Sequence, residues 1–419
     1  MQDMLYWIWL SLACTPGSQS FSKLISKYST PKAIYDEDRE GISRALGTTK
    51  SADLDSLADK DLSRAEQIYE FCTSKGVGLL TYSDERYPEN LRKLSNPPPL
   101  LYYRGTFPDF SNRTAVAVVG TRSLTDYGRR NAFLITSGLA SAGALVVSGM
   151  AIGIDGVAHA AALSVSGETL AVLGSGIDVC YPKDHLQLAR EIVKNGCIIT
   201  EYPPKTPPNG PNFPVRNRII SGLCDGVLVV EGKERSGALI TARYAKESGR
   251  RVYAVPGNVD NKNSESTNVL IKNGAIAVTR AEDIVSDLEE LLPGRLDPFC
   301  IGNVSKADIS EYLKRYSVSC LAPGDPVFDT KPKRKQSKHI TQPSAVKPEQ
   351  AETGLADPSG ITKEDLAVYK KIPPEGGCAI ESLIEGDLTL RKVMRILLKL
   401  EIGHFVTMLP GDRVRRNLH

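Results

Sequence analysis

The chain has 419 residues, of which 41% are apolar and 24% charged, and this composition excludes a fibrous or wholly disordered protein. Lysine and arginine outnumber aspartate and glutamate by 52 − 49 = 3, so binding to a polyanion must depend on local clusters of charge. The eight cysteines form no Cys-x-x-Cys pair, and only five histidines are present. We therefore expect free thiols in a cytoplasmic protein, with no metal site and no cofactor.

Four regions differ in their residue pattern. Residues 1–75 have helical periodicity, and the apolar start of the chain favours a core helix over a signal peptide because Asp3 stands where a basic residue belongs. Residues 76–295 alternate β-rich and helical runs. Residues 296–359 lose this periodicity, with six prolines between Ala322 and Ser359, and are predicted to be a flexible linker. Residues 360–419 regain helical periodicity and end in a predicted hairpin.

The middle region contains short runs that are rich in valine and isoleucine and apolar on both faces, as in strands that are covered on both sides. Helical runs such as Asp184–Asn195 and Ala238–Ser248 stand between most of them, and no stretch is long enough to span a bilayer. The alternation predicts an α/β fold with a doubly wound, mostly parallel, Rossmann-like sheet. The predicted strands are Val116–Val119, Ala144–Ser148, Leu170–Leu173, Cys197–Thr200, Val227–Glu231, Val252–Val255 and Ile276–Val278.

Residues suited to binding phosphate follow these strands, where ligands of such sheets bind. Glycines allow backbone amides to approach a ligand, helix starts favour anions, and arginine and lysine add charge. A helix begins after Ser236-Gly237, and Phe213 precedes a proline beside basic residues. The candidate site residues are Gly120, Arg122, Ser148, Gly149, Gly153, Gly174, Gly176, Lys183, Phe213, Arg216, Asn217, Arg218, Ser236 and Gly237.

Each of these features also has an interpretation without a ligand. Gly174-x-Gly176 lacks the third glycine of a dinucleotide fingerprint, since Val179 stands there, and is compatible with a simple tight turn. Phe213 is compatible with a wedge in the core, and Arg216 and Arg218 with a solvated helix face. Five such coincidences at the same end of one sheet nevertheless favour a phosphate-bearing ligand.

The motifs that are absent and the number of anion sites indicate which kind of phosphate-bearing ligand to expect. No Ser-His-Asp set and no Walker loop is present, and His159 and His185 fall within predicted helices, where a structural role is the commoner one. Several separated anion sites suit a polymer with repeating phosphates. An aromatic residue beside two arginines suits a stacked, unpaired base. The residues thus favour single-stranded nucleic acid.

The region from Tyr82 to Ala281 resembles the DNA-processing protein A family, also called Smf. The matching segments include Val119–Arg122, Ser148–Asp155, Leu173–Asp178, Phe213–Leu223 and Ser236–Thr241. The resemblance implies an extended Rossmann-like domain that binds single-stranded DNA without established catalytic turnover. It also implies a homodimer that loads the RecA recombinase onto incoming strands during natural transformation, with single-strand-binding protein as a further partner.

By the same resemblance, Arg122 would hold a phosphate and Lys183 would add charge, while Phe213, Arg216, Asn217 and Arg218 would line the site for base and backbone. Two positions depart from the family pattern. Gly210 replaces a lysine three residues before the Phe-Pro pair, for which Lys205 is an alternative, and Ser266 replaces a glycine.

The flanking regions also fit the family in outline. Residues 1–75 resemble its helical N-terminal domain, of SAM or helix-hairpin-helix type, for which simple packing and DNA contact both stay open. Residues 360–419 are predicted to be a winged helix, with helices at Glu364–Lys371, Ala379–Glu385 and from Thr389 to about Leu400, and a wing at Phe405–Arg416. Its ligand is either duplex DNA or a protein, or its basic face is simply solvated.

One enzyme class remains as an alternative function. The nucleoside monophosphate phosphoribohydrolases use a similar sheet and phosphate loop, with a glutamate near the fifth strand, a place that Glu231 takes here. Their Pro-Gly-Gly-x-Gly-Thr-x-x-Glu motif is absent from this chain. An NAD-dependent dehydrogenase is disfavoured because the dinucleotide fingerprint is incomplete.

Overall fold

The computed structural model describes residues 2–234, 236–302, 306–316 and 318. In the C-terminal region it describes 363–373, 378–383, 393, 396, 397, 400, 405–409 and 413–416. The chain divides into two compact units, Met1–Lys333 and Arg334–His419. None of the described helices is long and apolar enough to cross a membrane.

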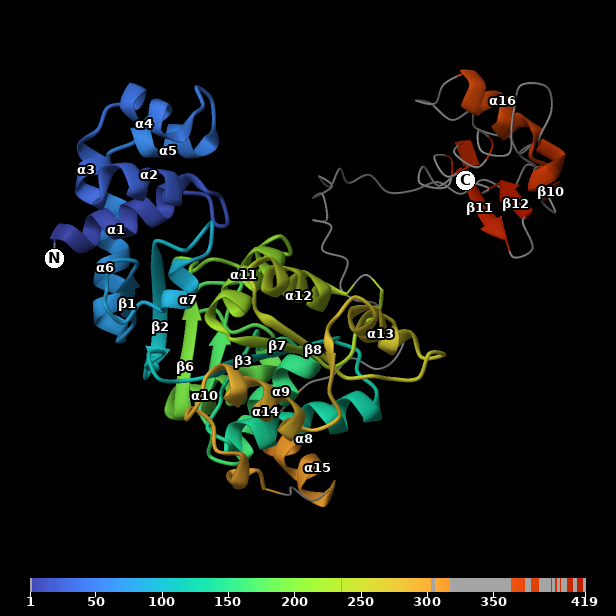
Figure 1. Ribbon diagram of the computed structural model, residues 1–419. Helices are drawn as coiled ribbons and strands as arrows, with labels where there is room; N and C mark the ends of the chain where they lie inside the picture. Colours follow the sequence, from blue (N-terminus) through green and yellow to red (C-terminus); the bar gives the residue numbers. More distant parts are fainter. Residues whose placement is uncertain are drawn as a thin grey trace, which may run out of the picture. The chain divides into compact units, whose positions relative to one another are not determined.

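The first unit begins with a group of short helices (Figure 1). Thr30, Asp38 and Ser51 each precede a helix and accept a hydrogen bond from a backbone N–H of its first turn, which satisfies donors that have no partner within the helix. Trp7 and Trp9 of the first helix are buried. These helices are α1 (Gln2–Ala13), α2 (Ser20–Tyr28), α3 (Pro31–Asp36), α4 (Arg39–Leu46), α5 (Ala52–Ala58) and α6 (Ser63–Lys75).

A nine-stranded sheet forms the centre of this unit, in the order β1-β2-β6-β5-β4-β3-β7-β8-β9. All seven predicted strands are present within two residues of their expected bounds, and they form the parallel part of the sheet. The antiparallel strands β1 and β2 at one edge were not predicted. The strands are β1 (Gly78–Thr81), β2 (Leu100–Gly105), β3 (Ala115–Val119), β4 (Leu145–Ser148), β5 (Thr169–Val172), β6 (Gly196–Thr200), β7 (Gly226–Val229), β8 (Arg251–Ala254) and β9 (Ile276–Ala277).

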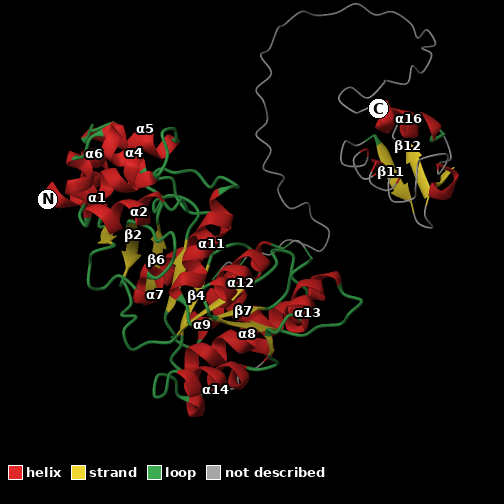
Figure 2. Cartoon of the chain, turned by 45° about the horizontal axis from the view of Figure 1, so that its top comes forward, coloured by secondary structure: helices red, strands yellow, loops and turns green. Residues whose placement is uncertain are grey.

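Helices cover both faces of the sheet (Figures 1 and 2). In β3, Val116 and Val118 pack with one layer of helices, and Ala115, Ala117 and Val119 pack with the other, as the alternation of side chains in a strand requires. The layer beside Val116 contains α8 (Asp126–Ser141), α9 (Ile154–Ser164), α14 (Ala281–Leu291) and α15 (Lys306–Arg315). The opposite layer contains α7 (Glu89–Arg92), α11 (Asn212–Leu223) and α12 (Gly237–Glu247).

The remaining helices of this unit are α10 (Leu186–Asn195) and α13 (Glu265–Lys272), with 3-10 turns η1 (Lys183–His185), η2 (Lys262–Ser264) and η3 (Pro298–Cys300). Helix α15 lies inside the segment predicted to be a flexible linker. Its Ile309 and the following Tyr316 are buried. This part of the predicted linker is therefore structured, because apolar residues spaced along one helix face pack against the layer beneath them.

The C-terminal unit contains α16 (Lys363–Lys371), the turn η4 (Ile380–Leu383) and a three-stranded antiparallel sheet in the order β10-β12-β11. The strands are β10 (Cys378–Ala379), β11 (Val406–Leu409) and β12 (Arg413–Arg416). Helix α16 and the β11–β12 pair lie where they were predicted, and η4 stands in place of the second predicted helix. Val393, Leu397 and Leu400 of the predicted buried stripe are buried, whereas Leu390 lies outside the described residues.

Candidate nucleic-acid interface

A cavity of about 480 Å³ opens beyond the carboxyl ends of β3 and β7, two neighbouring parallel strands. Its wall includes the loop after β3, the start of α9, the first turns of α11 with the segment before it, and the start of α12 with the loop before it. A doubly wound sheet is expected to bind its ligands at the carboxyl ends of its parallel strands. The candidate residues that line the cavity are Gly120, Arg122, Phe213, Arg216, Asn217, Ser236 and Gly237.

The aromatic ring of Phe213 lies in the first turn of α11 and is half-buried. The ring centroid of Tyr181 lies 5.7 Å away at an interplanar angle of 38°. The guanidinium carbons of Arg122 and Arg216 lie 5.5 Å and 5.9 Å from the Phe213 centroid. Phe213 thus has two arginines beside it in this cavity, although one of them is Arg122 and not the predicted Arg218.

Arg122 places a positive charge in the cavity, and its hydrogen-bond donors are available to a ligand. Its side chain is half-buried, and no hydrogen bond or ion pair to it occurs among the residues that the structure describes. Gly153 has a φ of +87°, and a Cβ there would lie 2.7 Å from the Cα of Arg122. Glycine at 153 thus lets the start of α9 pass close behind the loop that carries Arg122.

Arg216, by contrast, is a structural part of the cavity floor. Its buried guanidinium donates to the backbone carbonyls of Gly149 (2.9 Å) and Val172. Burial lowers the pKa of Arg216 to about 10, and the nearby Asp155 carboxylate opposes this shift. Burial also raises the pKa of Asp155, against the effect of Arg216 and Arg122. Arg216 is thus still protonated at neutral pH, and its donors serve mainly to join the ends of β4 and β5.

Four of the candidate glycines contribute to packing and do not line the cavity. A Cβ on Gly149 would lie 2.5 Å from the Arg216 guanidinium, and a Cβ on Gly174 would lie 2.9 Å from the Phe213 ring. On Gly176 it would lie 2.7 Å from the carbonyl oxygen of Pro203. Together with Gly153, these residues make room for neighbouring protein atoms. Of the candidate glycines, Gly120 and Gly237 alone face the cavity.

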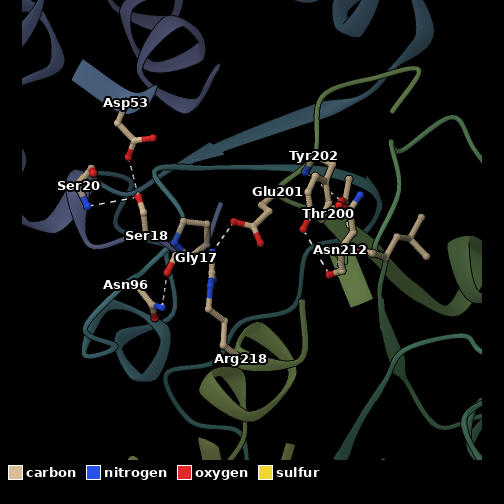
Figure 3. A network of polar contacts seen from close by, with 12 residues as sticks. Gly17, Ser18, Ser20, Asp53, Asn96, Thr200, Glu201, Tyr202, Asn212 and Arg218 are labelled. Atoms are coloured by element: carbon tan, nitrogen blue, oxygen red, sulfur yellow. Dashed lines mark hydrogen bonds and ion pairs between the residues drawn. The ribbon is translucent and has the colours of Figure 1, made fainter. Parts of the chain in front are cut away.

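Arg218 does not lie at the rim beside Arg122, contrary to expectation. Its side chain is 3% exposed and pairs with Glu201, which is 4% exposed (Figure 3). Both residues line a second, much smaller cavity together with Thr15, Gly17 and other residues of the N-terminal helical region. Five positions along an α-helix from Phe213 correspond to a rotation of about 140°, which turns Arg218 away from the ring.

Ser148 and Lys183 also lie outside the cavity. The hydroxyl of Ser148 is buried and donates to the carbonyl of Val118 at 2.6 Å, which ties β4 to β3. Lys183 is exposed at the start of η1. Lys205, the alternative to the lysine that Gly210 replaces, is exposed and does not line the cavity either, although Gly210 does.

The start of α12 completes the wall. Ser236 caps this helix by accepting a hydrogen bond from the backbone N–H of Ala238 at 3.3 Å. A Cβ on Gly237 would meet nothing within 4 Å, so a ligand has free access to the backbone there. The loop before the helix places Lys233 on the cavity wall. The sequence analysis missed Lys233 because a single lysine in a loop carries no distinctive pattern.

Glu231 and the two histidines considered in the sequence analysis have polar contacts within the protein. Glu231 is buried and accepts hydrogen bonds from the backbone N–H (2.9 Å) and hydroxyl (2.5 Å) of Thr125 at the start of α8. It does not line the cavity. Burial lowers the pKa of His159 to about 3. Nδ1 of His159 lies 2.7 Å from Oγ1 of Thr169, and Nδ1 of His185 lies 3.1 Å from the carbonyl oxygen of Met150.

Comparison with known proteins identifies the family of the chain. Residues 78–289 match the family model of the DNA recombination-mediator protein A. The chain is 40% identical over 225 residues to the DNA processing protein DprA of Bacillus subtilis, which covers 54% of this chain and 76% of that protein. It is 34% identical over 364 residues to protein Smf of Synechocystis, covering 84% and 83% of the two chains.

A crystal structure of DNA processing protein A from Streptococcus pneumoniae has a similar fold. It aligns with a TM-score of 0.59 at 32% identity and covers 67% of this chain and 95% of its own. The match of the family model to half of the chain and the similarity to Smf over 84% of the chain lead to the same assignment. The chain therefore belongs to the family of the DNA recombination-mediator protein A, which includes the proteins named DprA and Smf.

Proposed function

We propose that the protein binds single-stranded DNA in the cavity beyond β3 and β7. The observation that carries the proposal is the contact of Arg122 with the Phe213 ring, at 5.5 Å, inside a cavity of about 480 Å³. A base can stack on Phe213 only when it is unpaired, which favours a single strand over a duplex. Arg122, whose guanidinium has donors to spare, then contacts the adjoining phosphate, and this contact is independent of base sequence.

Titration of fluorescent oligothymidylate at several salt concentrations tests this function. Because Arg122 contributes charge, Arg122→Ala should weaken binding about tenfold at low salt and reduce the salt slope by about 0.7. Phe213→Ala should weaken binding by about 1–3 kcal/mol and leave the slope unchanged, because stacking releases no counterions. Arg243→Ala is the matched control, since this arginine of α12 is 64% exposed and lies outside the cavity. Equal affinities of all three variants and the wild type would rule out this site.

We further propose that the bound strand is passed to the RecA recombinase, so that the protein acts as a recombination mediator. The family to which the chain belongs supports this role. The assay is the rate of RecA assembly on single strands that are already coated by single-strand-binding protein. The wild type should accelerate assembly, and Arg122→Ala should do so less because it engages the strand less often. No acceleration with the cognate RecA would contradict the mediator role without affecting DNA binding.

A further inference from the structure

Lys233 is a cation of the cavity wall that takes no part in the DNA contacts proposed above. It is exposed and lies in the loop between β7 and α12. Arg122 occupies the corresponding loop after β3, the strand beside β7. Lys233, like Arg122, has no ion pair or hydrogen bond from its side chain to any described residue. The ammonium group is thus available to a ligand.

The loop that carries Lys233 is held in place on both sides. Before it, the backbone N–H of Gly232 donates to the carbonyl of Asn263 at 2.7 Å, and the carbonyl of Gly232 accepts from the N–H of Ser266 at 3.0 Å. After it, the carbonyl of Lys233 accepts from the N–H of Ser236 at 2.9 Å. The base of the lysine side chain is therefore fixed at the cavity wall, while its flexible end can follow a ligand.

The charges of the cavity decide what this lysine meets. The side chains along the described wall that carry a charge near neutral pH in their ordinary state are Arg122, Arg216, Lys233 and Asp155. Nη1 of Arg216 donates to two backbone carbonyls and Nε donates to Oδ1 of Asn217, so most of its contacts are made within the protein. Arg122 and Lys233 are two cations of one cavity whose side chains make no hydrogen bond or ion pair with any described residue, which is one more than a single phosphate contact requires.

We propose that Lys233 is a second phosphate-binding residue of this site, so that a stacked nucleotide is held through two backbone contacts. The proposal rests on the proposed binding of single-stranded DNA. It adds Lys233 to the binding residues and sets the number of phosphate contacts in the cavity at two. Each phosphate neutralised in a single strand changes the logarithmic salt slope of binding by about 0.7, so the two cations should be separable by titration.

The main experiment compares Lys233→Ala with Lys246→Ala in the oligothymidylate titration. Lys246 is a matched control because it is an exposed lysine near the far end of α12 and does not line the cavity. Lys233→Ala should weaken binding about three- to tenfold at low salt and lower the slope by about 0.7, and Lys233→Arg should restore both. Combined with Arg122→Ala, it should lower the slope by about 1.4. Lys246→Ala should match the wild type.

A second experiment tests whether the loop positions the lysine. A Cβ on Gly232 would lie 2.4 Å from Oγ of Ser266. Gly232→Ala should therefore displace the loop and reproduce part of the Lys233→Ala effect, and adding Ser266→Gly should relieve the clash and restore binding. Wild-type protein that does not bind the oligonucleotide would overturn the proposed function itself. Normal binding that Arg122→Ala weakens, with Lys233→Ala equal to Lys246→Ala, would overturn only the role of Lys233.

Discussion

At the scale of single residues, Arg216 and Arg218 show how two neighbouring arginines of one helix come to differ. Arg216 lies under the cavity and binds backbone carbonyls, while Arg218 points to the N-terminal helices and pairs with Glu201. Nε and Nη1 of Arg218 and Oε1 of Glu201 are buried without hydrogen-bond partners among the described residues. Burial raises the pKa of Glu201, and Arg218 opposes this shift. The stability of the folded protein therefore depends on both charges of this buried pair being present.

Glu201→Ala should lower the free energy of unfolding by about 3–5 kcal/mol, because it leaves the Arg218 charge buried and unpaired. Chemical denaturation in urea measures this change. The control is Asp55→Ala, which removes the carboxylate of an exposed ion pair with Arg39 and should cost about 1 kcal/mol or less. Replacing both partners by apolar residues, as in Glu201→Leu with Arg218→Met, should recover most of the loss. A cost of Glu201→Ala no larger than that of Asp55→Ala would contradict a structural role for this pair.

At the scale of the elements, the glycines that follow the strands control how close neighbouring segments approach. The sequence analysis expected them to face a ligand, yet Gly149, Gly153, Gly174 and Gly176 mostly make room for protein. Gly174 in particular leaves space for the Phe213 ring of α11. The loop after β5 thereby determines the position of the ring on which the proposed base stacks.

Gly174→Ala should therefore impair binding more than folding. Its Cβ would lie 2.9 Å from Cδ1 of Phe213, so the ring must shift by several tenths of an ångström. Because stacking contributes about 1–3 kcal/mol per base, we expect oligothymidylate affinity to fall up to tenfold, with an unchanged far-UV circular dichroism spectrum. Gly302→Ala is the control, since a Cβ there would meet nothing within 4 Å. Wild-type affinity in Gly174→Ala would show that the ring position is not limiting.

At the scale of the whole molecule, the N-terminal helices and the sheet share one hydrophobic core. Residues of α1, such as Ile8 and Leu10, belong to the same buried cluster as Tyr102 of β2 and Ile198 of β6. Asn96 donates to the carbonyl of Gly17 at 2.8 Å and adds a polar contact between the two regions (Figure 3). Residues 2–75 are thus expected to unfold together with the sheet, because separation would expose this shared surface to water.

Both tryptophans of the chain, Trp7 and Trp9, lie in α1 and are buried, so their fluorescence reports on the N-terminal helices. In urea, the fluorescence transition should have the same midpoint as the loss of hydrogen-exchange protection in β5, as two-state unfolding requires. Peptide-level exchange in α1 provides an internal check on the fluorescence. A fluorescence transition at clearly lower urea than that of β5 would mean that the helices separate first.

Much of the architecture could be predicted because it depends on local pattern. Strands β3 to β7 are runs of mostly apolar residues that are buried along their whole length, and burial on both faces makes such runs easy to recognise. Strands β1 and β2 were missed because they pair antiparallel and lie outside the alternation of strands and helices from which the other strands were predicted. Helix α15 was missed because it was grouped with the proline-rich segment that follows it, and the whole of residues 296–359 was predicted to be a linker.

By itself, the sequence determined the fold class and showed that the cavity lies at the carboxyl ends of the strands. It also predicted that Arg122 and Phe213 line this cavity. These results follow from the order of the strands and from the side chains next to the strand ends. The tertiary structure alone decided which basic residues share the cavity. Arg218 and Lys183 lie away from it and Lys233 lies on its wall. The physical reason is that the direction of a side chain depends on helix rotation and on contacts between loops that are far apart in the chain, and no local pattern encodes these.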